Sequence, residues 1–309
     1  MNRRICVAVV MLSASTHSSA AGITSLDPIT AIIDAYRTHT IVALDDDHGE
    51  ERCASFRLSL IRDPRFIETV NDIVVEFGNS RYQPVIDAFV AGDRVSEETV
   101  RAVWQDTTTP RAVWDRPVYE EFFRAVRGVN AGRDRNRQLR VLLGDPPIDW
   151  QQVRTAADLQ QWSNGRSIFP AELIAREVIA KHRRALVIYG GLHLMRQNLQ
   201  GENLIERVDK HAPGTAFVIV GHPFANLAAL GIDSRSWRQP TVVLTSGTSL
   251  ANQIDAVLYL GPPSERRMSQ LPAALCSDPS YRSMRISRMA ISGDDKGREQ
   301  FNRECASGK

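Results

Sequence analysis

The chain has 309 residues, of which 43% are hydrophobic and 24% charged, with a formal net charge of +2 at pH 7. This length and composition predict a globular protein with a full hydrophobic core. Acids and bases are nearly balanced, which argues against a nucleic-acid interface and against a polybasic patch that binds membranes.

The first 21 residues have the pattern of a secretory signal peptide. Arg3 and Arg4 precede an apolar run at 5–12, and small residues follow up to Ala21. The apolar run is too short to span a membrane as a helix. We therefore expect an exported protein, periplasmic or secreted, which begins near residue 22 and has no membrane span in its mature chain.

The stretch from residue 40 to 79 carries the strongest pattern. An apolar run at 41–44 (IVAL) ends in the polar sequence 45–49 (DDDHG), and a segment of helical spacing leads to a second apolar run at 73–75 (IVV). Short apolar runs joined by a helix are typical of a parallel sheet that is buried on both faces. Ligands bind beyond the carboxyl ends of such strands, where this sequence has His48 and Glu76.

Helices and strands continue to alternate along the chain. Further helices are expected at 82–90, 117–126, 171–181 and 204–211, and further strands at 139–143, 185–189, 216–220, 241–244 and 256–260. We interpret residues 95–130 as a helical excursion over the carboxyl edge of the sheet. The pattern predicts an α/β fold, a mostly parallel β-sheet with helices on both faces, in a single domain from residue 22 to 309.

Titratable side chains recur where the predicted strands end. They are His48, Glu76, Asp145, His193 and His222. One such residue has little weight, since loops are polar and acids cap helices. Five at one edge favour a reactive cleft for general acid-base chemistry. We also expect Asn79 and Asp145, which follow two of these strands, to bind substrate.

The block around His48 resembles the erythromycin esterase superfamily, which includes ChaN-like haem-binding proteins and the TraB and Tiki families. That superfamily has a Gly-Glu-x-x-His-Gly loop after the first strand, an arginine on the next helix and a glutamate ending the second strand. Here His48, Arg57 and Glu76 stand at these positions, and His193 matches a later strand-end histidine. Asp45 replaces the glutamate of the loop. The resemblance covers about residues 38–200 and is closest to the esterase branch.

The resemblance implies water-mediated hydrolysis of an ester-like bond in a small molecule, without a covalent intermediate. We expect His48 to take a proton from water, with Glu76 or Asp45 orienting its ring. Arg57 would hold a substrate carboxylate or an oxyanion, and His193 would protonate the leaving group.

Other interpretations stay open. The TraB and Tiki branches suggest a metal-dependent hydrolase, whose oxygen and nitrogen ligands would come from Asp45, Asp47, His48, Glu76 and His193. The short-spaced histidine and paired cysteine signatures of metal sites are absent from the sequence. The ChaN-like branch suggests a protein that binds haem or another small ligand. Taken singly, the acids at 45–51 could cap a helix. From the sequence we assign no cofactor and no metal ligand.

Three cysteines follow the signal sequence. Because exported proteins form disulfides, we predict a bond between Cys276 and Cys305 that ties the polar tail to the body. Cys53 would then be free, and we interpret it as a small buried thiol on the first helix.

Overall fold

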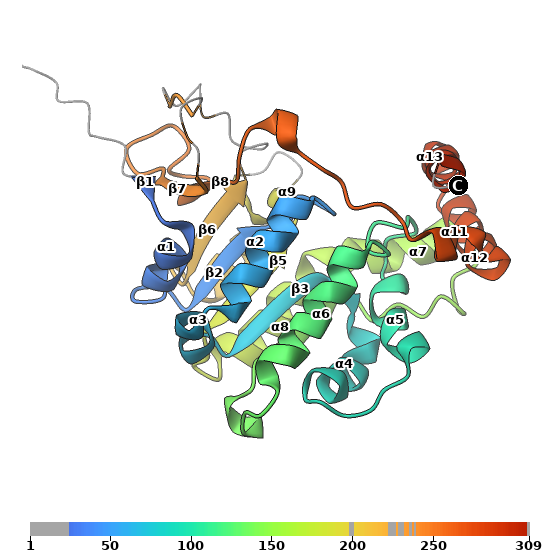
Figure 1. Ribbon diagram of the computed structural model, residues 1–309, viewed down its shortest axis with the longest axis horizontal. Coiled ribbons are helices and arrows are strands. Elements are labelled where there is room, and N and C mark those ends of the chain that lie inside the picture. The colour runs from blue at the N-terminus through green and yellow to red at the C-terminus, as the bar shows by residue number, and fades with distance from the viewer. Residues whose placement is uncertain are drawn as a thin grey trace, which may run out of the picture.

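The computed structural model describes residues 25–197, 201–221, 227, 232–234, 237 and 239–307. The expected signal peptide and His222 lie outside the described residues. Within these, eight strands form one sheet in the order β1-β7-β8-β6-β2-β5-β3-β4 (Figure 1). The strands are β1 (Ser25–Leu26), β2 (Ile41–Asp45), β3 (Asp72–Asn79), β4 (Arg140–Asp145), β5 (Ala185–Tyr189), β6 (Ala216–Gly221), β7 (Thr241–Leu244) and β8 (Ala256–Tyr259).

The sheet is mostly parallel. Strands β4, β3, β5, β2, β6 and β8 run parallel to one another, whereas β7 is antiparallel to both β8 and β1. The central strands β2, β3 and β5 are buried along their whole length, as expected for continuous apolar runs with helices on both sides. The predicted α/β fold is confirmed. Among the predicted strands, the largest difference is at β3, which continues past the predicted apolar run through Glu76 to Asn79, and β1 is a strand that was not predicted.

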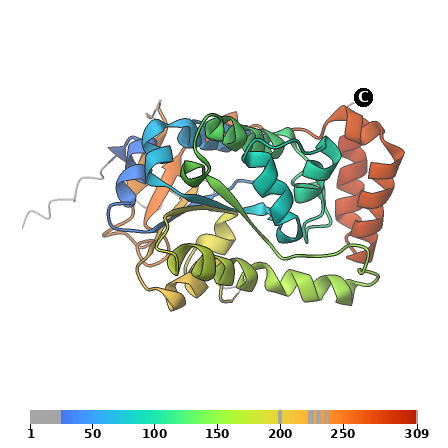
Figure 2. The ribbon, with the colours of Figure 1, turned by 90° about the horizontal axis from the view of Figure 1, so that it is seen from below.

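Helices cover both faces of the sheet (Figure 2). On one face lie α1 (Pro28–Ala35), α2 (Glu51–Arg62), α3 (Pro64–Thr69), α4 (Gln83–Val90), α5 (Glu97–Gln105) and α6 (Pro117–Asn130). On the other lie α8 (Ile168–Ile174), a π-helical turn (Ala175–Ile179) and α10 (Leu204–His211). The remaining short elements are η1 (Ser80–Tyr82), η2 (Arg135–Arg137), α7 (Ala156–Ser163), η3 (Asn164–Arg166), α9 (Gly191–Leu194) and η6 (Pro263–Glu265).

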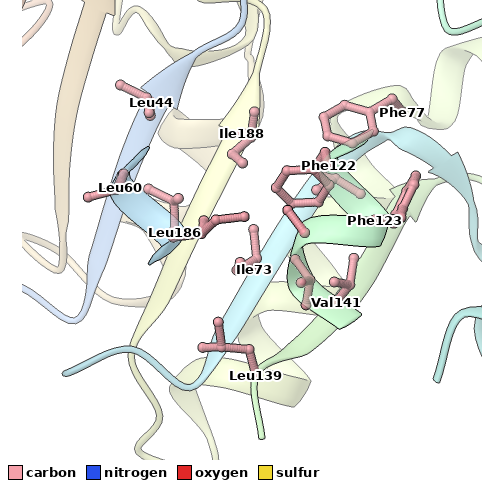
Figure 3. Close-up of a cluster of buried hydrophobic side chains, with 14 of the residues drawn as sticks. Leu44, Leu60, Ile73, Phe77, Phe122, Phe123, Leu139, Val141, Leu186 and Ile188 are labelled. Atoms are coloured by element: carbon pink, nitrogen blue, oxygen red, sulfur yellow. The ribbon is translucent and has the colours of Figure 1, made fainter. Parts of the chain in front are cut away.

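Strand alternation divides the core into two clusters. In β2, Leu44 packs toward α2 and α6, while Ala43 packs toward α8 and α10. Successive side chains of a strand point to opposite faces of the sheet. Figure 3 shows the first cluster, where Ile73, Leu186 and Ile188 meet side chains of α2 and α6. The two clusters together fix the strands whose carboxyl ends carry the candidate site.

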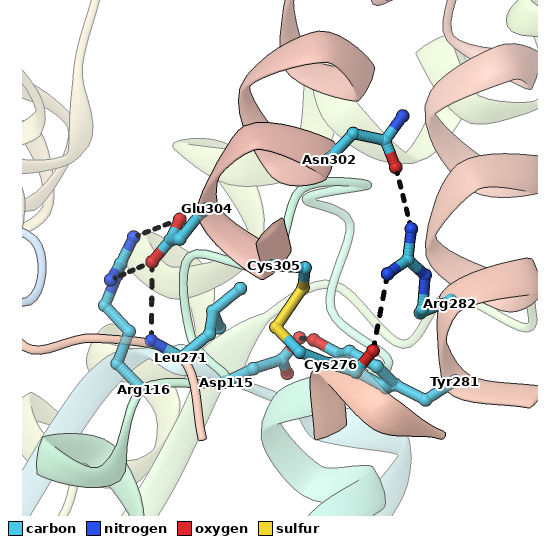
Figure 4. Close-up of a disulfide and its surroundings, with 9 residues drawn as sticks. All are labelled: Asp115, Arg116, Leu271, Cys276, Tyr281, Arg282, Asn302, Glu304 and Cys305. Atoms are coloured by element: carbon cyan, nitrogen blue, oxygen red, sulfur yellow. Dashed lines mark hydrogen bonds and ion pairs between the residues drawn. A yellow bond between two sulfur atoms is a disulfide. The ribbon is translucent and has the colours of Figure 1, made fainter. Parts of the chain in front are cut away.

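The C-terminal segment forms a helical unit of its own, beside α5 and α7 (Figure 1). It consists of α11 (Ala273–Ser277), α12 (Pro279–Ile291) and α13 (Asp295–Ser307). The predicted disulfide between Cys276 and Cys305 is present, with the two Cα atoms 5.1 Å apart (Figure 4). Cys53 is free and partly buried.

This unit holds the loop at 106–116, which joins α5 to α6. Arg285 of α12 forms a buried ion pair with Asp115 at 2.7 Å, and Arg288 pairs with Asp106 at 2.6 Å. Arg116 in turn pairs with Glu304 of α13 at 2.8 Å (Figure 4). In the described part of the chain, no helix is long and apolar enough to cross a membrane.

Candidate active site

The sheet order brings three strand ends together. Strand β5 lies between β2 and β3 and is parallel to both, so the carboxyl ends of all three meet at one edge. His48 follows β2, Glu76 lies in the last part of β3, and His193 lies on α9 directly after β5. Residues that are far apart in the sequence therefore lie side by side.

The carboxylate of Glu76 is the centre of the cluster. Its Oε2 accepts a hydrogen bond from the backbone N–H of Gly190 at 2.8 Å. Its Oε1 lies 2.6 Å from Nη2 of Arg166 and 3.4 Å from Nε2 of His193. Burial opposes ionisation of this carboxyl, but His193, Arg166 and His48 outweigh it and hold the pKa of Glu76 well below its usual range. Glu76 is therefore an anion at neutral pH.

The ring of His48 lies on the Oε2 side of this carboxylate. A Cβ atom added to Gly190 would be 2.7 Å from Cε1 of His48 and 3.5 Å from Oε2 of Glu76. The ring also packs edge-on against Trp114, with the ring centroids 4.8 Å apart. Glycine at position 190 thus leaves the space that the imidazole occupies.

His48 is a cation at neutral pH. Burial disfavours its charged form, but Asp46, Glu76 and Asp45 together outweigh burial and raise the pKa of His48 to about 9. Nδ1 of His48 lies 3.6 Å from Oδ2 of Asp46, which is too long for a full hydrogen bond but close enough for strong attraction. A neutral His48 that takes a proton from water, as the resemblance implied, does not fit this electrostatic environment.

Asp46 and Arg57 form a buried ion pair next to His48. Nη1 of Arg57 donates to Oδ1 of Asp46, and the hydroxyl of Tyr119 donates to Oδ2 at 3.0 Å. The side chain of Arg57 is only 2% exposed, and that of Asp46 is fully buried. Arg57 therefore does not reach a substrate, and its expected role in holding a carboxylate or an oxyanion does not fit. It fixes Asp46, which faces His48.

Asp45 points away from this ion pair. Its Oδ2 accepts a hydrogen bond from the backbone N–H of Gly221 at 3.0 Å. Burial raises the pKa of Asp45 to about 7, despite that hydrogen bond. The carboxylate closest to Nδ1 of His48 is that of Asp46, so the ring is not oriented by Asp45 as expected.

The side chains of the two expected substrate-binding residues form hydrogen bonds within the protein itself. The amide nitrogen of Asn79 donates to the carbonyl oxygens of Asp106 and Ile148 at 2.7 and 2.9 Å. The carboxylate of Asp145 accepts from the backbone N–H and the hydroxyl of Thr108, at 2.7 and 2.6 Å. Both side chains are buried. They hold the loop at 106–116 against the sheet edge, and substrate contact does not fit this placement.

The metal set suggested by the TraB and Tiki branches does not fit either. Across the described ranges, no three histidine, cysteine, aspartate or glutamate side chains are arranged to hold a metal ion. Asp47 pairs with Arg266, and Asp45 bonds to the backbone. His48 and His193 instead share the one carboxylate of Glu76.

Sequence reasoning missed Arg166 and gave Asp45 the place of Asp46. Arg166 lies in η3, between α7 and α8, and therefore not at the end of a strand. Asp46 had a usable signal. Because side chains alternate along a strand, Asp46 must point to the same face as Leu44, where α2 carries Arg57.

A separate cavity of about 1010 Å³ lies away from this cluster. It is lined by α1, α2, and the segments around β7 and β8, among them Phe56, Thr241 and Leu260. It contains none of the residues around Glu76.

Comparison with known proteins gives similarities at the level of the fold. No protein family matches the chain, and no curated protein matches its sequence. A Bacillus cereus protein of solved structure is 11% identical with a TM-score of 0.54, over 77% of this chain and 91% of its own. ChaN of Campylobacter jejuni, solved with cofacially bound haem, is 11% identical with a TM-score of 0.46, over 75% and 91%. The type III effector HopBA1 is 12% identical with a TM-score of 0.46, over 78% and 98%.

Proposed function

We propose that the protein hydrolyses an ester-like bond at the site formed by His48, Glu76 and His193. One observation carries this proposal. A buried carboxylate, held ionised, lies between two histidines whose side chains are 40% and 24% exposed. Two partly exposed imidazoles beside one anion can serve as an acid and a base.

His193 is the base in this proposal. Its Nε2 faces Glu76 at 3.4 Å, so the N–H at that position points to the carboxylate and the lone pair is on Nδ1. Glu76 thereby selects the tautomer of His193 and stabilises the ring once it is charged, as a carboxylate does for the histidine of a hydrolytic triad.

His48 is the acid. With a pKa of about 9 it carries a proton at neutral pH, and it can donate that proton where negative charge develops. These roles are the reverse of those that the family resemblance implied. The reversal follows from the carboxylates of Asp46 and Glu76 on either side of the His48 ring.

In the proposed reaction, His193 accepts the proton that water loses and His48 supplies the proton that the leaving group gains. Water attacks the carbonyl carbon and gives a proton to Nδ1 of His193, while His48 donates a hydrogen bond to the carbonyl oxygen. The carbon to alkoxy-oxygen bond then breaks as the alkoxide takes the proton of His48. Solvent returns a proton to His48 and removes one from His193, which restores the starting state.

A panel of ester substrates with purified variants tests this proposal. We expect His193→Asn and Glu76→Gln each to lower kcat/KM by about 10² to 10⁴, and activity to be lost as pH rises through about 9, where His48 loses its proton. His211→Gln is the matched control, because His211 is an exposed histidine at the end of α10. A His193→Asn protein with the parent rate and intact circular dichroism would contradict the proposal. An absorbance spectrum with added haem tests the ligand-binding alternative.

We also infer that the protein is exported. The order of charged, apolar and small residues at 1–21 supports this, and so does the disulfide between Cys276 and Cys305. N-terminal sequencing of protein from its native host should begin near residue 22. Recovery of a chain that starts at Met1 would contradict export by cleavage.

A further inference from the structure

In the candidate site, the basic side chains are more exposed to solvent than the acidic side chains. The basic side chains reach solvent: His48 is 40% exposed, Arg166 is 30% and His193 is 24%. The acids lie below them, with Asp46 fully buried and Glu76 3% exposed. An incoming molecule therefore meets the basic groups first.

Arg166 has hydrogen-bonding capacity to spare. A guanidinium has five N–H donors, and one of them, on Nη2, donates to Oε1 of Glu76 at 2.6 Å. The described residues provide no other hydrogen bond to this group. Arg183, at a similar exposure of 29%, donates through both Nε and Nη2 to the carboxylate of Asp72. The forked edge of Arg166 has no comparable partner.

The position of Arg166 is nevertheless fixed. The ion pair with Glu76 anchors one end of its side chain. Its backbone lies in η3, which connects α7 to α8. A guanidinium that is held in place with free donors is suited to bind a planar anion with two parallel hydrogen bonds.

We propose that Arg166 forms an anion subsite beside the two histidines, and that the ester hydrolysed here carries a carboxylate or phosphate group. The reaction in this statement rests on the proposed function, whereas the binding of the anion does not. The imidazolium of His48, which also lies near Glu76, adds positive charge to the same site.

Two esters that differ by one charge test the subsite. The 4-nitrophenyl half-ester of adipate and 4-nitrophenyl hexanoate have acyl chains of equal length, and only the first ends in a carboxylate. We expect the parent to prefer the charged ester, after subtraction of spontaneous hydrolysis, and Arg166→Gln to reduce the ratio of the two kcat/KM values by about 10- to 100-fold. The ratio cancels any loss that both esters share through Glu76.

Two further variants sharpen the result. Arg166→Lys keeps the charge but not the fork, so it should restore part of the preference. Arg154→Gln is the matched control and should keep the full ratio, because Arg154 is an exposed arginine of the same connection that donates to the carbonyl of Val153. A parent without preference, or an Arg166→Gln protein that retains it, would overturn the subsite while leaving hydrolysis standing.

Binding separates this inference from the reaction. If no ester is hydrolysed, the proposed function fails, and calorimetry with adipate, inorganic phosphate and neutral adipamide decides the subsite alone. Binding of either anion that weakens at least tenfold in Arg166→Gln, with no binding of adipamide, supports it and shows whether a carboxylate or a phosphate is preferred. A parent that binds neither anion overturns it.

Discussion

Replacement of Asp46 by asparagine should destabilise the protein strongly, although the two side chains have nearly the same shape. Arg57 is 2% exposed and donates to Asp46, while its Nε and Nη2 have no hydrogen-bond partner among the described residues. The aromatic rings of Phe77 and Tyr119 lie 6.0 Å from its guanidinium carbon and offer only weak compensation. The substitution therefore leaves a buried positive charge without its counter-ion.

Loss of one partner from a buried ion pair costs about 3 to 5 kcal/mol. The neighbouring position provides a control, because Asp47 pairs with Arg266, whose side chain is 41% exposed. Asp47→Asn should cost less than about 1 kcal/mol. Urea denaturation of the parent and both variants at one pH measures the free energies of unfolding. Equal losses in the two variants, or a loss below 1 kcal/mol in Asp46→Asn, would refute the reasoning.

The same variant has a second readout. Asp46 is one of the carboxylates that raise the pKa of His48 to about 9, so Asp46→Asn should lower that pKa. Titration of the His48 ring by NMR measures it directly. An unchanged titration would mean that Asp46 does not act on His48, even if the loss of stability is found.

Three other predictions concern the geometry and the charge of the site and the C-terminal unit. Gly190→Ala places a Cβ 2.7 Å from Cε1 of His48, so it should cost about 1 to 3 kcal/mol and shift the NMR signals of that ring, whereas Gly128→Ala, which meets open space, should not. The pKa of His48 is about 9 in the folded state and 6.5 in the unfolded state, so its contribution to stability is complete below pH 6.5 and is lost as pH rises through 9. His48→Gln should flatten this part of the curve of unfolding free energy against pH. Equal slopes in the parent and the variant would contradict the prediction. Joint replacement of Cys276 and Cys305 by serine opens a loop with a sequence separation of 29 and should cost about 3.5 kcal/mol, measured by urea denaturation; a midpoint equal to that of the oxidised parent would contradict it.

The pattern of apolar runs was sufficient to predict the fold. Strands β2, β5, β6 and β7 begin at the predicted residues, because a strand buried on both faces must be apolar along its length. The end of β3 was harder to predict. Glu76 and Asn79 belong to the strand although they are polar, since Glu76 accepts hydrogen bonds from Gly190 and Arg166, and Asn79 donates one to the carbonyl oxygen of Asp106 at the start of the loop at 106–116. Such partners are visible only in three dimensions.

The site could be predicted in part. Strand-end position placed His48, Glu76 and His193 at one edge, but their adjacency depends on β5 lying between β2 and β3, which no local pattern encodes. The protonation of His48 depends on the summed field of Asp46, Glu76 and Asp45, and that field depends on distances. Arg166 reaches Glu76 from η3, which shares no motif with the strands. The roles of residues whose protonation depends on neighbouring charges could therefore be assigned only from the structure.

The contacts between the C-terminal helices and the loop at 106–116 also determine how the molecule opens locally. That loop carries Trp114 against His48, and it is tied to α12 and α13 through Asp115 and Arg116. Proteins open locally in cooperative units, and these ion pairs link the loop to the C-terminal helices. We therefore expect the backbone amides of the loop to exchange with deuterium at the rate of the C-terminal helices, and more slowly when the disulfide is intact. The loop beside His48 would then be protected from local unfolding by the disulfide between Cys276 and Cys305, in a different part of the chain. The exchange rate of its amides would report the redox state of the surroundings.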